Sequence, residues 1–138
     1  MRDRLPVMFA ALWWGSLTAV GFVVVPQLFA HLPTPAMAGA MAARLFTAQT
    51  WVSVACGVLL LLLLASRERG GGGTAAWAKT ATPFIVAGLL LALLVEFAVA
   101  PRIVARENLK LWHGVGSAMY LLQWLCAGAA LWKASRSG

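Results

Sequence analysis

The chain has 138 residues, of which 62% are apolar and 11% charged, and its mean hydropathy is +0.83. A soluble domain usually carries about 25% charged residues, so this composition argues against a soluble enzyme, a disordered chain and a disulfide-stapled secreted domain. The net charge of +7 would suggest a nucleic-acid partner for a soluble protein. Here the bases sit at the ends of apolar runs, where they act as topology signals and contact anionic lipids. We therefore expect no nucleic-acid binding, and we interpret residues 1–138 as a single transmembrane domain.

Four apolar runs follow one another along the chain, at about residues 5–30, 45–66, 78–100 and 111–132. Each is close to the roughly 20 residues that a helix needs to cross about 30 Å of hydrocarbon. The first run is longer than the apolar core of a signal peptide, which is about 7–15 residues, so we expect it to be retained. The sequence thus predicts an all-α fold, an integral membrane antiparallel four-helix bundle joined by short loops.

The connections between these runs carry helix start and stop signals. Thr34 is a good N-cap and Pro35 a good first helical residue. The second helix therefore starts near Pro35 and runs past the bilayer, or a short interfacial helix over residues 36–43 precedes it. Glycines 70–73 predict a flexible linker, and Pro101, which lacks an N–H, predicts the end of the third helix.

The distribution of bases predicts the orientation in the membrane. With the N-terminus inside, seven bases lie on the cytoplasmic side (Arg2, Arg4, Arg67, Arg69, Lys79, Lys133 and Arg136) and four outside (Arg44, Arg102, Arg106 and Lys110). Because positive charge accumulates on the cytoplasmic side, we expect both termini to be cytoplasmic.

The polar residues of the spans gather in one outer layer. Glu96, the acid inside the third run, lies about one turn before the expected helix end, His113 about one turn inside the fourth run, and His31 at the end of the first. An acid within a span is costly unless it is paired, so it marks a pathway or a partner. Glu96 is interpreted as a contact for a cation, a proton or a cofactor, with His113 as ligand or proton relay and Arg44 or Arg106 orienting the carboxylate. The alternative is a structural ion pair between Glu96 and Arg44, Arg102 or Arg106.

The fourth run carries a polar stripe, because His113, Ser117 and Tyr120 are spaced i, i+4 and i+7. The stripe indicates either a ligand site or a hydrogen-bonded seam between helices, where Gly114 and Gly116 would permit close approach.

Two histidines on different helices could bind haem iron, and histidine with methionine could bind copper. Met37 and Met41 could be soft ligands for Cu(I), although anchoring at the membrane interface explains them as well. No nucleophile elbow and no paired carboxylates occur in the sequence, so hydrolytic catalysis has no support.

Two segments resemble a known family: the end of the first run, with Trp14-Gly15 and Pro26-Gln27-Leu28-Phe29-Ala30-His31-Leu32-Pro33, and the start of the fourth, Leu111-Trp112-His113-Gly114-Val115-Gly116-Ser117. They resemble the small bacterial membrane proteins of the transmembrane-protein-205-like family, a family of undefined role. More distantly, the chain is similar to the CopD-type copper-resistance proteins and to the HemJ-type protoporphyrinogen oxidases. The HemJ type places its haem-ligand histidine before the tryptophan of the first span, whereas residues 6–12 here contain no histidine. The resemblance implies a multi-pass protein of the bacterial cytoplasmic (inner) membrane.

We therefore expect a non-enzymatic membrane protein whose outer-facing polar site, built around Glu96, His113 and His31, handles a metal ion, a cofactor or a small cation. Copper or haem are the candidate cofactors. One alternative is a structural or assembly subunit of a membrane complex or homo-oligomer, and another is a haem-binding redox protein. The expected surroundings are the lipid bilayer, with anionic lipids at the cytoplasmic face.

Overall fold

The computed structural model describes residues 4–71 and 74–136, and those residues form helices without any strand. In chain order the helices are α1 (Leu5–Thr18), η2 (Ala19–Val24), α2 (Val25–His31), α3 (Pro35–Gly70), α4 (Thr74–Leu94), η3 (Val95–Val99), α5 (Ala100–Val104) and α6 (Leu109–Ser135). Within the described residues, four stretches are long and apolar enough to cross a membrane: Leu5–His31, Pro35–Gly70, Ala76–Val104 and Leu109–Ser135. The predicted all-α fold with four spans is therefore confirmed.

The second span starts much earlier than the apolar run itself. Thr34 caps α3, since its Oγ1 accepts a hydrogen bond of 3.2 Å from the backbone N–H of Met37, and Pro35 is the first helical residue. The helix then continues without a break for 36 residues, a length of about 54 Å at 1.5 Å per residue. The segment 36–43 is thus the first part of α3 and not a separate interfacial helix. The predicted glycine linker falls partly on residues 72–73, which lie outside the described residues.

Prolines interrupt two of the spans with π-helical turns. At the end of η2 the N–H of Val25 donates to the carbonyl of Val20, five residues back, and Pro26 follows directly. The third span repeats this pattern in η3, where Ala100 donates to Val95 and Pro101 follows. A proline ring meets the carbonyl four residues earlier, and the wider π turn moves that carbonyl aside. The prediction that Pro101 ends the third helix is therefore wrong, because α5 extends it to Val104.

The packed core lies in the half of the molecule where all four spans meet. Trp13 is its largest fully buried side chain, and the tip of its indole ring lies against Gly88 of α4. Alanines occupy most of the remaining positions on α4 and α6, including Ala81 and Ala130. Small residues let membrane helices approach closely, and close approach is the main source of attraction between helices in lipid.

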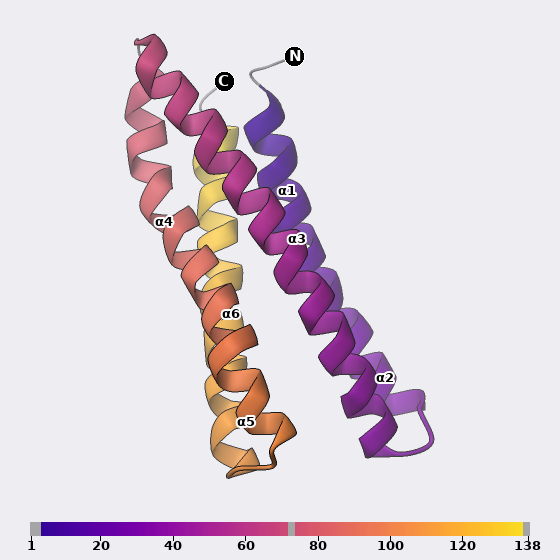
Figure 1. Ribbon diagram of the computed structural model, residues 1–138. Helices are drawn as coiled ribbons and strands as arrows, with labels where there is room; N and C mark the ends of the chain where they lie inside the picture. The colour runs from indigo at the N-terminus through magenta and orange to yellow at the C-terminus, as the bar shows by residue number, and fades with distance from the viewer. Residues whose placement is uncertain (1–3, 72–73, 137–138) are drawn as a thin grey trace.

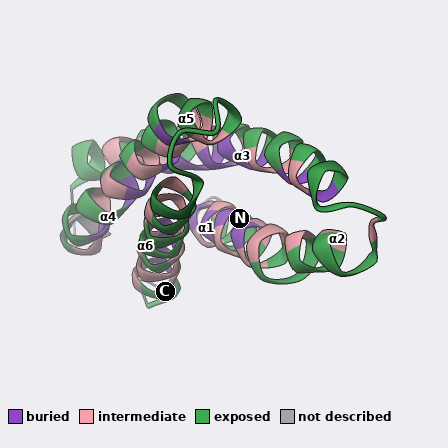
Figure 2. Ribbon diagram, turned by 90° about the horizontal axis from the view of Figure 1, so that it is seen from below, coloured by how far each residue is buried: buried purple, intermediate pink, exposed green. Residues whose placement is uncertain are grey.

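The spans separate toward the other end. Figure 1 shows that the start of α1 and the end of α6 lie at the same end as the turn between α3 and α4, whereas at the opposite end the ribbons diverge into two arms. In one arm α2 packs on α3, and in the other α5 packs on α6. Neither α2 nor α5 contains a buried residue, and in Figure 2 the buried segments lie mainly on α1, α3 and α4.

Candidate functional site

Glu96 lies in the third span, between α4 and α5. It belongs to the π turn η3, its side chain is half-buried, and its Oε1 accepts a hydrogen bond of 2.9 Å from Oγ1 of Thr47 on α3. This bond joins the two arms. Because the π turn widens the helix next to Pro101, it affects the direction in which the Glu96 side chain points.

No base forms an ion pair with Glu96 among residues 4–71 and 74–136. Arg102 instead pairs with Glu107, with 3.5 Å between Nη1 and Oε2, and its guanidinium lies 4.7 Å from the centroid of the Trp112 ring. Arg44 is exposed on α3, and Arg106 is exposed in the loop after α5 with a positive φ of 57°. A threonine hydroxyl, rather than the expected arginine, therefore orients the carboxylate.

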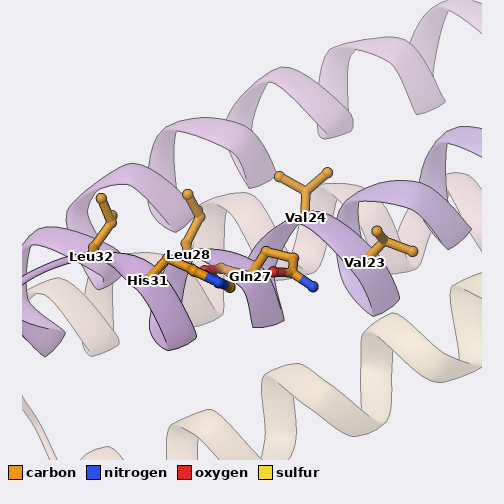
Figure 3. A pocket seen from close by; sticks show the side chains of 6 residues that line it. All are labelled: Val23, Val24, Gln27, Leu28, His31 and Leu32. Atoms are coloured by element: carbon orange, nitrogen blue, oxygen red, sulfur yellow. The ribbon is translucent and has the colours of Figure 1, made fainter.

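His31 lies at the end of α2 on the molecular surface. Its Nδ1 is 3.1 Å from the backbone oxygen of Gln27, a contact within its own helix. Both residues line a shallow groove along η2 and α2 whose other lining residues are Val23, Val24, Leu28 and Leu32. Figure 3 shows these six side chains spread along the helix, with Gln27 and His31 as the polar members.

His113 is exposed in the second turn of α6, on the arm opposite to α2 (Figures 1 and 2). The structure therefore places the two predicted histidines on different arms. Within the described part of the chain, no three side chains of histidine, cysteine, aspartate or glutamate come together as metal ligands. Met37 and Met41 are both exposed, near the start of α3.

The predicted stripe on α6 divides into two parts. Tyr120 forms a helix–helix seam, because its hydroxyl donates a hydrogen bond of 2.6 Å to the carbonyl of Leu17 and its ring packs against Gly21. Gly116 also allows close packing, since a Cβ at that position would lie 3.3 Å from Val99. Ser117, by contrast, is exposed.

A buried polar cluster, which the sequence analysis missed, joins three spans. Gln49 and Ser53 of α3 and Gln123 of α6 are all at least 96% buried. Ser53 donates a hydrogen bond of 2.9 Å to Oε1 of Gln123, and Gln49 donates one of 2.9 Å to Ser16 of α1. Trp13 Nε1 lies 3.5 Å from the same Gln123 oxygen.

The signal for this cluster was present in the sequence. Gln49, Ser53 and Gln123 are uncharged polar residues inside apolar runs, and such residues commonly hydrogen-bond across membrane helices. Gln49 and Ser53 are one helical turn apart, but their partner Gln123 lies 70 residues beyond Ser53 on another span, so no sequence motif connects the three.

Comparison with known proteins identifies the family but no characterised relative. A family model described as "Domain of unknown function (DUF4149)" matches residues 8–111, so the chain belongs to that family. No curated protein and no solved structure matches the chain.

Proposed function

We propose that this member of the DUF4149 family is a multi-pass membrane protein that binds a small monovalent cation at Glu96. The observation that supports this is the unneutralised carboxylate: within the described residues Glu96 is hydrogen-bonded to Thr47 and forms an ion pair with no base. An acid inside a span is costly unless it faces a partner, and such residues commonly mark ion pathways or ligand sites.

The hydrogen bond from Thr47 compensates only part of that cost. A hydrogen bond to a charged group contributes about 1.5–3 kcal/mol, whereas a charged side chain in a span costs about 2.5–3.5 kcal/mol or more. One hydroxyl donor does not neutralise the carboxylate. Because the Glu96 side chain is half-buried, a small ligand can still reach its carboxylate. A cation bound beside Glu96 would supply the missing charge.

The ligand set favours a monovalent cation over a transition metal or haem. Calcium takes about six to eight oxygen ligands, and copper and haem iron prefer imidazole or sulfur. Glu96 and Thr47 together offer one carboxylate and one hydroxyl, and His31 and His113 lie on different arms. Glu96 carries one negative charge, which a primary ammonium group or an alkali ion that keeps most of its hydration water would balance.

The orientation of the chain is part of the same proposal. We place the helices alternately across the bacterial inner membrane with both termini in the cytoplasm, since seven bases then lie inside and four outside. Glu96 would be reached from the outer side. The segments around Pro26–Pro33 and Leu111–Ser117 also resemble those of the transmembrane-protein-205-like family and, more distantly, of the CopD and HemJ types.

Calorimetric titration of the purified chain in neutral detergent tests the cation site. The titrants are potassium chloride, sodium chloride and methylammonium chloride at constant ionic strength, and the variants are Glu96→Gln and Thr47→Val. We expect E96Q to abolish binding, because it removes the charge with little change of shape, and T47V to weaken it about tenfold through loss of one hydrogen bond to a charged group.

Glu107→Gln is the matched control, since Glu107 is exposed and already paired with Arg102. It should bind all three salts as the original chain does. Unchanged binding by E96Q, or equal loss in E96Q and E107Q, would contradict the assignment to Glu96.

A second candidate function, assembly with a membrane partner or with copies of the chain, is favoured by the arm formed by α2 and the first part of α3. This arm leaves the rest of the molecule (Figure 1) and exposes Phe29, Met37 and Met41. Light scattering coupled to size exclusion in detergent would distinguish the two functions, because it measures the oligomeric state. A monomer that binds the cation would show that the site forms without assembly.

A further inference from the structure

At the end opposite to Glu96, a groove runs between α1 and α6 that the cation site does not use. The groove is open along one side, has a volume of about 660 Å³ and is lined by Trp14, Trp124, Leu125, Gly128, Ala129, Leu131, Trp132, Lys133 and Ser135. All of these side chains except Trp14 belong to α6. From the geometry we infer that this groove holds one anionic phospholipid, with an acyl chain along the apolar floor and the phosphate at the cationic rim.

The shape of the groove is held by hydrogen-bonded and stacked aromatic side chains. Trp14 and Trp124 stack with their ring centroids 5.6 Å apart, and Trp124 Nε1 donates a hydrogen bond of 2.8 Å to Thr18 on the neighbouring helix. Gly128 lets the Trp14 ring lie directly on α6, since a Cβ there would lie 3.0 Å from Trp14 Nε1. Beside this wall, Ala129 carries only a methyl group and Leu125 and Leu131 add apolar surface, so the floor suits a chain of methylene groups. A preformed groove of this kind loses little conformational entropy when a ligand binds.

The polar groups of the groove lie where a phospholipid changes from acyl chain to headgroup. Lys133 and Ser135 line the last turn of α6, and the guanidinium of the exposed Arg136 lies 4.7 Å from the Trp132 ring centroid. Deeper in the groove the lining is apolar and aromatic, with Trp14 and Trp124 beside Leu125 and Ala129. An exposed tryptophan next to bases is typical of the membrane interface.

The charge at this end of the molecule selects an anionic lipid rather than a neutral one. Among the residues that the structure describes, six bases lie at this end (Arg4, Arg67, Arg69, Lys79, Lys133 and Arg136) and one acid, Glu68. An apolar helix of a partner protein would match the floor of the groove, but it would leave Lys133 and Arg136 without anionic partners. A phosphate satisfies both the charge and the hydrogen-bonding capacity of the rim.

Native mass spectrometry of the full chain in neutral detergent tests the inference. Phosphatidylglycerol and phosphatidylcholine with identical acyl chains are added separately, and the retained lipid per chain is counted. We expect one tightly retained phosphatidylglycerol. The double variant Lys133→Gln with Arg136→Gln should lower its affinity by about thirtyfold, the factor that two bases at about 1 kcal/mol each would give.

Two further variants distinguish a site from general attraction. Arg69→Gln with Lys79→Gln removes the same charge from the same end but from α3 and α4, away from the groove, and should retain the lipid. Ala129→Leu fills the groove and should displace either lipid. Equal retention of the two lipids by the original chain, equal loss in both double variants, or a dimer that binds no lipid would each overturn the inference.

Discussion

Gly88 and Gly15 should respond in opposite directions to the same substitution. A Cβ added at Gly88 would lie 2.6 Å from Cη2 and 2.8 Å from Cζ2 of Trp13, whose side chain is 0% exposed. An ordinary contact between carbon atoms is about 3.5 Å, so the indole would have to withdraw by about 0.9 Å. It cannot do so freely, because the ring is enclosed by the core that includes Leu17 and Ile85.

Overpacking of this kind costs about 1–3 kcal/mol. A Cβ at Gly15, which lies inside α1, meets nothing within 4 Å, and alanine in a helix interior is favoured over glycine by about 0.5–1 kcal/mol. We therefore expect Gly88→Ala to destabilise the protein and Gly15→Ala to stabilise it. The difference between the two variants should be about 1.5–4 kcal/mol, the sum of these ranges.

The assay is equilibrium unfolding in mixed micelles, followed by far-ultraviolet circular dichroism so that no tryptophan signal enters the measurement. Each variant is compared with the original chain at the same detergent composition. The reasoning fails if Gly88→Ala is as stable as the original chain, or if both substitutions shift the transition in the same direction by similar amounts. Either outcome would mean that the Trp13 ring leaves room for a methyl group at Gly88.

Three other perturbations test separate features. A double-mutant cycle of Ser53→Ala and Gln123→Met should give a coupling free energy of about 0.6 kcal/mol, the average for hydrogen bonds between membrane helices. Zero coupling in the mixed-micelle unfolding assay would show that the 2.9 Å hydrogen bond between the two side chains does not contribute to stability. Thr34→Ala should cost about 1 kcal/mol because it removes the N-cap of α3, and faster hydrogen exchange in the first turn would show it, whereas unchanged exchange would contradict the cap. Pro101→Ala should allow the π turn before it to close to an α-helical turn. Backbone chemical shifts of residues 95–99 check this, and unchanged shifts would show that the proline is not the cause.

The number and order of the spans could be predicted from the sequence because lipid imposes a simple length requirement. A run of about 20 apolar residues is needed whatever surrounds it, and four such runs are visible between the charges. The start of α3 was also predictable, since Thr34 and Pro35 are local capping signals that act within one turn.

The candidate site was predictable only in part. Glu96 stands out because an acid inside an apolar run is rare, but its partner Thr47 lies 49 residues earlier in the chain and carries no motif. Arg44 or Arg106 was expected to orient the carboxylate, and Arg44, Arg102 or Arg106 to form an ion pair with it in the alternative interpretation, because these bases lie near the outer layer. The structure instead directs Arg102 to Glu107 and Trp112 in the loop after α5, contacts that depend on the path of that loop.

Proline shows the same division between local and tertiary control. Its missing N–H correctly indicates a break in the hydrogen bonds at Pro101, but whether the helix ends or widens there depends on what packs around it. Here Val99 lies against Gly116 of α6, a contact that accompanies the continuation of the span through α5.

By itself, then, the sequence determined that the chain is all-helical, that it has four stretches long and apolar enough to span a membrane, and that the third apolar run contains an acid, Glu96, near one end. These properties follow from composition and from interactions within a few residues. Only the tertiary structure decided that Glu96 meets Thr47, that Gln49, Ser53 and Gln123 join across helices, and that the two histidines lie on different arms. The reason is that every span is apolar on most of its surface, so the helical pattern leaves its rotation and its neighbours undefined until close packing selects them.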